Sequence, residues 1–319
     1  MTTYSDLVCM LGGVPALAGI PFGPKSKYYF VDPVNGSDSN AGTSLAAPKK
    51  SLQAAEELCV ANQHDTVFFI AGATADNPTA AITWDKDYTH LIGIGSPLPG
   101  LGQRCRVVML AATVATPVIT ISASGCIFKN LQFNQEKATG AASGVAIVTG
   151  SRNYFENVFF MAPTSATLAS YSLKVSGSEN VFYRCTVGQY TNFRSEASYG
   201  LWLFGASTCL RNKFVQCEFL SWQGGAGSAH AHIYVDSAVA VVPWVIWFEN
   251  CFFGANYSGG TIQTQAIDDN STSAGHQIIL RGHNDFLGCS AVADTLTYIF
   301  APNPEDDVSG LLMIAVNEG

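Results

Sequence analysis

The chain has 319 residues, a net charge of −8 and only 13% charged residues against 48% hydrophobic ones. The 16 basic residues are scattered along the chain, which argues against a phosphate-binding surface for DNA or RNA, and no apolar run is long enough to span a membrane. A surface with so little charge is expected to face other protein, so we expect a homo-oligomer or a larger assembly.

Residues 1–27 precede the first expected strand and are predicted to form an arm or linker. Residues 1–20 lack a basic leader and do not resemble a secretory signal. The segment carries four apolar side chains that are candidates for docking on a neighbouring protein: Leu7, Val8, Met10 and Leu11. A disordered leader is the alternative interpretation.

Residues 28–319 are predicted to form one domain, which begins with an opening turn and a capping helix over residues 28–64. Asp32 and Asp38 in the turn offer oxygen ligands for calcium, but such turns usually bond their own backbone. The sequence leaves calcium open there and predicts no metal or cofactor. Ser51 is the expected N-cap of a helix reaching Ala61, whose apolar face would cover the open end of the first coil.

Residues 65–300 are predicted to form the coils, and residues 301–319 a C-terminal tail. An eight-residue sequence motif, which we call the phrase, recurs six times within the coil segment. Its third place is always phenylalanine, at intervals of 27 to 38 residues: Phe128, Phe155, Phe182, Phe214, Phe248 and Phe286. Such a period predicts a stacked repeat architecture. Its fifth place favours residues that tolerate a left-handed backbone: Asn130, Asn157, Arg184, Gln216, Asn250 and Gly288.

A left-handed bend at the fifth place would turn the third, sixth and eighth side chains inward. A further short strand ending near glycine precedes most copies of the phrase. Equivalent strands of successive coils would then lie parallel and about 4.8 Å apart, with the six phenylalanines stacked as one column in the core. The sixth places should form a second interior stack, of buried reduced thiols: Cys185, Cys217, Cys251 and Cys289.

The segments 130–133 and 250–253, both an asparagine bend followed by apolar residues, resemble the pectin-lyase-like superfamily, as does the opening segment 29–43. The resemblance covers about residues 28 to 300. It implies an all-β fold, a right-handed single-stranded parallel β-helix with a short N-terminal capping helix. That superfamily contains lyases, hydrolases, epimerases and inert virion proteins, so the resemblance alone implies no single reaction.

Asp268, Asp269 and His283 faintly resemble the acid and histidine motifs of polygalacturonase-like hydrolases, and a possible third acid is either Asp236 or Glu218. Glycoside hydrolysis needs two carboxylates at a suitable separation. Adjacent aspartates on a strand point to opposite faces, so at most one of Asp268 and Asp269 can serve. We therefore expect no complete catalytic constellation, and regard a solvated loop as the alternative for these acids.

Aromatic residues between positions 190 and 247 suit either a sugar-binding surface or a subunit interface. Trp222, flanked by small and polar residues, is the tryptophan expected to be most exposed. His230 and His232 are interpreted as residues of an exposed loop, because no further acid or thiolate lies close to them in sequence.

These features together favour a bacteriophage structural protein made in the host cytoplasm and carried in the virion. The leading hypothesis is a trimeric capsid decoration or cement protein, which binds the viral major capsid protein through its arm and one flank of the β-helix. The alternatives are a tailspike-like polysaccharide depolymerase, acting as hydrolase or lyase, and a carbohydrate-binding adhesin without catalysis. A non-enzymatic role is favoured, and the host and the position on the virion are left open.

Overall fold

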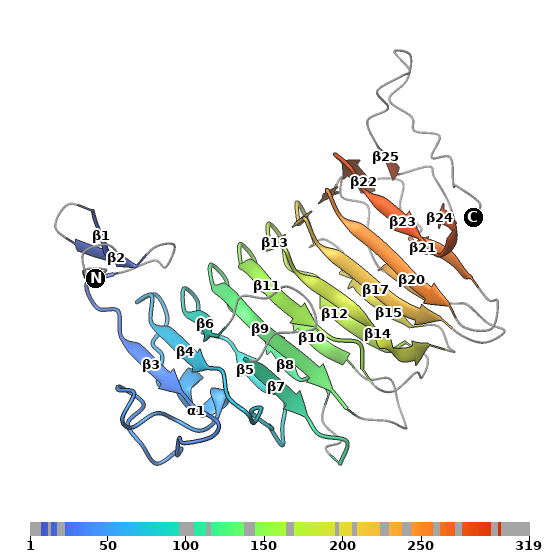
Figure 1. Ribbon diagram of the computed structural model, residues 1–319. Helices are drawn as coiled ribbons and strands as arrows, with labels where there is room; N and C mark the ends of the chain where they lie inside the picture. The colour runs from blue at the N-terminus through green and yellow to red at the C-terminus, as the bar shows by residue number, and fades with distance from the viewer. Residues whose placement is uncertain are drawn as a thin grey trace, which may run out of the picture.

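The computed structural model describes residues 8–11, 14–17, 23–95, 105–112, 116–136, 144–163, 169–194, 198–205, 209–223, 230–237, 244–257, 262–271, 276–294 and 299–300. Their strands stack along a rod that runs from the N-terminal to the C-terminal part of the chain (Figure 1). All strand pairs of the rod are parallel, whereas β1 (Val8–Leu11) and β2 (Val14–Leu17) form a separate antiparallel pair. No described helix is long and apolar enough to cross a membrane.

The rod begins with β3 (Tyr28–Val31), the opening turn and the single described helix, α1 (Leu52–Glu56). Ser51 caps α1, since its hydroxyl accepts a hydrogen bond from the Ala54 amide. Leu52 and Ala55 are fully buried and close the core of the first coils. The helix is shorter than the sequence predicts, since it ends at Glu56 and the chain continues as turns and irregular backbone, with left-handed residues at Asn62 and His64.

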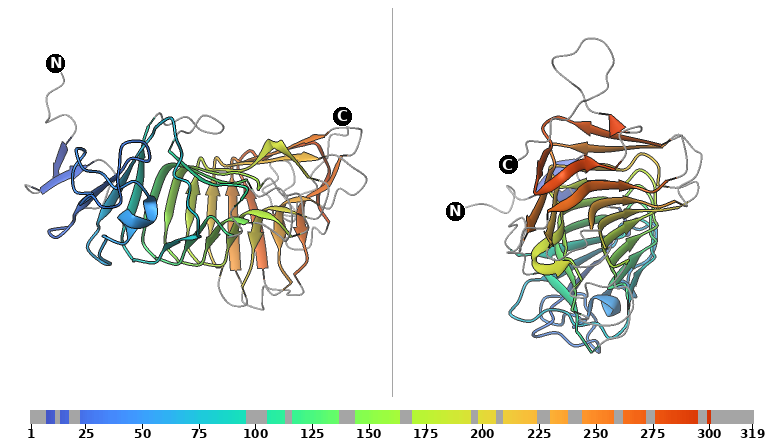
Figure 2. Two further views of the ribbon diagram at one scale, coloured as in Figure 1. Left: turned by 90° about the horizontal axis from the view of Figure 1, so that it is seen from below. Right: turned by 90° about the vertical axis from the view of Figure 1, so that its right-hand side faces the viewer.

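One sheet has eight strands, in the order β24-β21-β18-β15-β12-β10-β8-β5. Its strands are β5 (Ile82–Trp84), β8 (Ile119–Ile121), β10 (Gly144–Val148), β12 (Tyr171–Val175), β15 (Tyr199–Leu203), β18 (Ala231–Val235), β21 (Gln263–Asp269) and β24 (Cys289–Ala293). Each coil contributes one strand to it. The end-on and side views in Figure 2 show this sheet facing the second sheet across the core.

The second sheet has fifteen strands and divides at a bend into two branches that share β9 and β11. One branch contains β3, β4 (Thr66–Ile70), β6 (His90–Ile94), β9 (Ile127–Gln135), β11 (Tyr154–Phe160), β13 (Val181–Tyr183), β16 (Lys213–Val215), β19 (Trp244–Glu249), β22 (His276–Arg281) and β25 (Ile299–Phe300). The other contains β7 (Arg106–Met109), β9, β11, β14 (Thr186–Arg194), β17 (Glu218–Gln223), β20 (Phe252–Tyr257) and β23 (Asp285–Leu287). Each coil therefore crosses three faces, and the right-handed parallel β-helix predicted from the sequence is the observed fold.

The bend between the two branches is made by the residues predicted for it in five coils. Their φ angles are positive and nearly equal: Asn130 55°, Asn157 53°, Arg184 51°, Gln216 53° and Asn250 54°. Asparagine reaches this left-handed region at low cost. At Arg184 and Gln216 the surrounding coils impose it, and the two side chains hydrogen-bond each other across neighbouring coils at 3.0 Å.

Five phenylalanines, one in each of these coils, form a continuous column inside the rod. Ring centroids lie 4.9 Å apart for Phe128 and Phe155, 4.6 Å for Phe155 and Phe182, 4.6 Å for Phe182 and Phe214, and 5.0 Å for Phe214 and Phe248. All five side chains are fully buried. The parallel register places like residues above one another, so their rings stack face to face.

The sixth copy departs from the predicted register. Leu280, not Phe286, pairs with Phe248, while Phe286 pairs with Phe253 and stacks on it at 4.6 Å. The bend of this coil is Gly282, with φ of 71°. The prediction that Phe286 joins the column is therefore wrong, because third and eighth places are both apolar and inward, so sequence alone does not separate them.

Three of the four predicted thiols form the interior stack. Cys185, Cys217 and Cys251 are buried, and their Sγ–H groups donate to carbonyls of the preceding coil. Burial raises the pKa of Cys217 and Cys251 well above the usual thiol value, which leaves them unreactive. Cys289 lies instead at the start of β24, opposite Gln263, and is half-buried. It belongs to the sixth copy of the phrase, whose register is displaced.

Candidate functional site

The outer face of the eight-stranded sheet carries a row of large polar and aromatic side chains over four neighbouring strands. Lys174, Trp202, Tyr234 and Asp268 stand in register on β12, β15, β18 and β21, and we call them the aromatic row. They point outward because the residues flanking them along each strand are fully buried. All four are half-buried, so their outer surfaces remain accessible.

Trp202 is the centre of a cluster of aromatic rings. The edges of Tyr171, Tyr199 and Tyr234 meet it at centroid distances of 5.7, 5.3 and 5.6 Å. The Lys174 ammonium lies 3.6 Å from the Trp202 centroid and 4.2 Å from that of Phe204, in cation–π geometry. Burial against these rings lowers the pKa of Lys174, and the negative charge of Asp236 opposes the shift.

Two carboxylates border this cluster from neighbouring coils. Asp236 follows β18 and accepts a hydrogen bond of 2.8 Å from the Trp202 Nε1–H. Asp268 follows Tyr234 in the aromatic row, and burial, then the charges of Asp294 and Asp269, raise its pKa above the usual value. Since Val235 pairs with Asp269, the two acids stand diagonally across adjacent strands. Asp236 turns its Oδ2 toward Trp202 on the preceding coil, whereas Asp268 lies on the following coil.

Asp269 is separated from this surface, as expected for adjacent residues on a strand. Its side chain is only 1% exposed and lies 2.6 Å from His276 Nε2. Burial opposes ionisation, but the hydrogen bonds from His276 and Ser271 outweigh it and lower the pKa of Asp269. The Ser271 hydroxyl is 3.1 Å from His276 Nδ1 and 3.4 Å from Nε2. An oxygen nearly equidistant from both ring nitrogens is not aligned with either, so these residues do not form a catalytic triad.

The remaining predicted site residues lie elsewhere. His283 is 84% exposed in the bend of the fifteen-stranded sheet, where it pairs with Asp285 at 2.8 Å, so it does not meet Asp268. Trp222 is half-buried on β17 and pairs with Asn256. Val8, Met10 and Leu11 belong to β1, but their side chains, like all of Leu7, are outside the described residues.

The exposed-loop interpretation of His230 and His232 is wrong. His230 is 5% exposed and hydrogen-bonds the Ser198 hydroxyl at 2.9 Å, while His232 is fully buried beside Phe253. Burial lowers the pKa of His232 to about 3, so its imidazole is neutral. The sequence contained a usable signal, since Ala231 to Val235 has the alternation of a strand.

The N-terminal turn leaves little capacity for calcium. The Asp32 carboxylate accepts bonds from the Val34 and Asn35 amides and from the Asn35 side chain. That of Asp38 accepts from the Lys50 and Ser51 amides and from the Ser51 hydroxyl. Among the described residues no group of three or more acids, histidines or cysteines could hold a metal ion.

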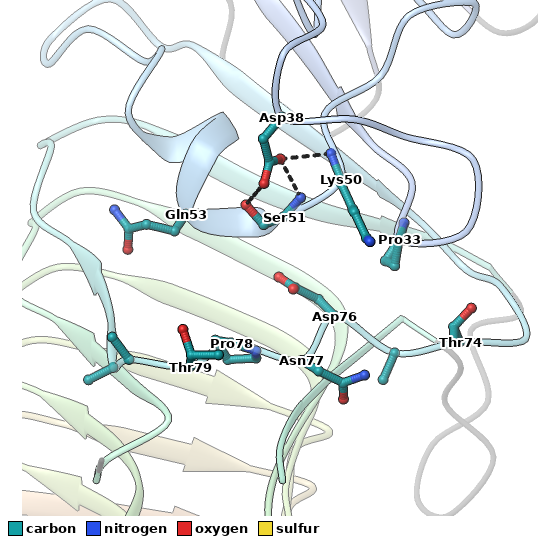
Figure 3. A pocket seen from close by; sticks show the side chains of 13 residues that line it. Pro33, Asp38, Lys50, Ser51, Gln53, Thr74, Asp76, Asn77, Pro78 and Thr79 are labelled. Atoms are coloured by element: carbon teal, nitrogen blue, oxygen red, sulfur yellow. Dashed lines mark hydrogen bonds between the residues drawn. The ribbon is translucent and has the colours of Figure 1, made fainter. Parts of the chain in front are cut away.

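A cavity of about 580 Å³ opens beside this turn (Figure 3). The opening turn, the residues at the start of α1 and the segment 74–81 form its walls. Asp76, which is buried, lies below Asp38 and Lys50 in this view. The sequence analysis did not single out Asp76, because only the folded coil brings it against α1.

Comparison with known proteins agrees with the architecture. No protein-family model and no curated protein sequence matches the chain. Among solved structures, a rhamnogalacturonan lyase aligns with TM-score 0.55 and 17% identity over 82% of this chain and 68% of that one. A pectate lyase aligns with TM-score 0.50 and 18% identity over 83% and 65%, and the ORF18 protein of Geobacillus virus E2 with 0.46 and 11% over 86% and 61%.

The chain thus spans about two thirds of the length of the two lyases. At these identities the likeness concerns the fold alone. The fold is a right-handed parallel β-helix like that of the two lyases, and the repeated phrase predicts its stacked parallel coils.

Proposed function

We propose that this β-helix is a bacteriophage structural protein that decorates the capsid and stabilises the virion head. The observation that carries the proposal is the organisation of the N-terminal end. There, β1 and β2 pair only with each other among the described strands, beside a rod whose first coils are closed by α1. A two-stranded pair of apolar sequence that joins neither sheet of the rod is suited to docking on another protein.

The composition supports the same role. The surface of an isolated monomer with 13% charged residues and 48% hydrophobic ones would be poorly solvated. Burial of the arm and one flank of the rod against the major capsid protein, in a trimer or another homo-oligomer, would cover much of that surface. Among the described residues, Cys185, Cys217 and Cys251 are buried free thiols, which fits synthesis in a reducing host cytoplasm.

Deletion of residues 1–27 tests this proposal. We expect the full chain to co-sediment with assembled capsids and to raise their resistance to heat or chelation. The deleted chain should lose both effects while keeping the circular dichroism spectrum of a β-helix, because the rod starts at Tyr28. The Trp202→Ala variant is the matched control and should bind capsids normally. Equal binding by the deleted chain would contradict the proposal.

A second candidate function, glycan binding with or without cleavage, is favoured by the aromatic row. Half-buried rings on a flat parallel sheet offer stacking surfaces to pyranose rings, and the carboxylates of Asp236 and Asp268 offer acceptors to sugar hydroxyls. The raised pKa of Asp268 suits a general acid, and Asp236 at the end of the neighbouring strand supplies a second carboxylate on the same face of the sheet. A tailspike-like depolymerase or an adhesin would use this surface.

The charge of the surface predicts which glycans it accepts. The surface has a negative net charge, because three carboxylates (Asp236, Asp268 and Asp294) stand against the single ammonium group of Lys174. We therefore expect neutral oligosaccharides to bind at least tenfold more tightly than polyuronates. Calorimetry with neutral bacterial glycans and with polygalacturonate checks the order. Trp202→Ala should weaken neutral glycan binding about fivefold, by loss of ring stacking. Preference for the polyuronate would contradict this assignment.

Cleavage separates the depolymerase from the adhesin. A depolymerase should release reducing ends from host polysaccharide, and Asp236→Asn or Asp268→Asn should reduce that rate by about 100-fold or more. Asp285→Asn, on the other sheet, is the matched control and should keep full activity. An adhesin should bind without releasing reducing ends.

A further inference from the structure

The cavity beside the opening turn is built from segments that are distant in sequence and rigidly held. Its floor carries Asp76, whose backbone pairs with Val107 of the next coil in an isolated parallel bridge. The Asp76 amide donates to the Arg106 carbonyl at 2.9 Å, and its carbonyl accepts from the Val108 amide at 2.8 Å. The position of the Asp76 carboxylate is therefore fixed by the rod itself.

Asp76 as a whole residue is 6% exposed, yet it lines a cavity of about 580 Å³. Oδ2 accepts the Leu52 amide at 2.8 Å. Burial raises the pKa of Asp76 to about 6, although this hydrogen bond opposes the shift. The carboxylate is therefore largely desolvated in the folded protein, so ligand binding requires little further desolvation free energy from it.

The charges around Asp76 leave the cavity short of positive charge. Asp38 raises the pKa of Asp76 more than Lys50 lowers it. Lys50 is exposed at the rim and forms no ion pair among the described residues, and the Arg106 guanidinium bonds the Ala73 carbonyl instead. Figure 3 shows the Lys50 side chain on the wall opposite Asp76.

The remaining walls combine polar and apolar side chains, the polar ones being Ser51, Gln53, Thr74, Asn77 and Thr79. Pro33 and Pro78 face the cavity together with alanines at positions 75, 80 and 81. Val34, next to Pro33, is 48% exposed. A buried carboxylate in a cavity whose walls include prolines and alanines matches the sites at which protein interfaces receive a long basic side chain, because its methylenes can pack on the apolar parts of the walls.

We infer that this cavity is a socket for an arginine or lysine side chain of a protein partner, with Asp76 as the counter-ion. The partner's identity as a capsid subunit rests on the proposed function, but the chemistry of the socket does not. A guanidinium or ammonium group placed against Asp76 supplies the missing positive charge, and the proline and alanine walls hold the aliphatic stem.

The test uses the full chain and N-acetyl-argininamide as the probe, with binding followed by calorimetry. We expect saturable binding at pH 7.5 that weakens about tenfold at pH 5, because protonation of Asp76 competes with the cation. Asp76→Asn keeps an acceptor for the Leu52 amide and should abolish binding. Lys50→Ala should strengthen binding, since it removes a competing cation. Asp85→Asn, an exposed acid outside the cavity, is the matched control and should change nothing.

The Lys50→Ala variant makes the inference falsifiable even if Asp76→Asn folds poorly. Weaker binding in Lys50→Ala would show a zwitterionic or polyhydroxylated ligand site and would overturn the socket. Equal binding of the probe by Asp76→Asn, or no binding by the wild type, would do so as well. Capsid decoration is judged separately by deletion of residues 1–27, so either proposal can fail alone.

Discussion

Phe182→Ala is expected to lower the free energy of unfolding by about 3–5 kcal/mol, the largest effect we predict for a single substitution. Phe182 is fully buried, stacks on Phe155 and Phe214 at 4.6 Å each, and meets the edge of Phe160 at 6.4 Å. Alanine would leave a cavity between neighbouring coils. The backbone hydrogen bonds between these coils prevent them from moving together to fill it.

Denaturation in guanidinium chloride, followed by circular dichroism, measures this loss. Leu287→Ala is the matched control, because Leu287 is 61% exposed on the last coil and should cost less than about 1 kcal/mol. A loss in Phe182→Ala no larger than in Leu287→Ala would show that the phenylalanine column does not stabilise the rod.

His232→Leu is expected to change the response of the protein to acid. His232 is fully buried, neither ring nitrogen has a hydrogen-bond partner among the described residues, and burial lowers its pKa to about 3. The folded value lies below the ordinary histidine value of about 6.5. Below that pH the unfolded chain binds a proton that the folded chain cannot, so stability falls as the pH decreases.

The expected loss from this one group is about 1.4 kcal/mol per pH unit below about pH 6, or roughly 4 kcal/mol by pH 3. Unfolding measured from pH 8 to pH 4 should show a shallower acid decline in His232→Leu than in the wild type. At pH 8 the variant should be equally or more stable, because an unpaired ring N–H leaves the core.

His283→Gln serves as the control, since that side chain is 84% exposed and should leave the acid decline nearly unchanged. His90 contributes a similar decline in both proteins, because burial, then the neighbouring His64, lowers its pKa to about 4. Parallel pH profiles for the wild type and His232→Leu would refute the prediction.

The candidate site was only partly predictable from sequence. Asp236 and Asp268 were recognised as acids of interest, and the opposite orientation of Asp268 and Asp269 followed from strand geometry. The aromatic row was not found, because Lys174, Trp202, Tyr234 and Asp268 are 28, 32 and 34 residues apart and contact one another only through the register of the coils. The socket at Asp76 was missed for the same reason.

What the sequence by itself determined is the local geometry of each coil. Asparagine or its substitutes at the fifth place set the bend, and phenylalanine at the third place set the inward side, from Phe128 to Phe248. These properties depend on backbone preference and side-chain polarity within eight residues, so they can be predicted without knowledge of the neighbouring strand.

Which residues of successive coils lie above one another depends on the tertiary structure. Phe286 lies over Phe253, and His232 is buried although it shares its strand with the half-buried, outward-facing Tyr234. Both outcomes depend on hydrogen bonds between residues about 30 positions apart and on the volume left inside the rod. Register and burial between coils are collective properties of the stacked chain, and no single segment encodes them.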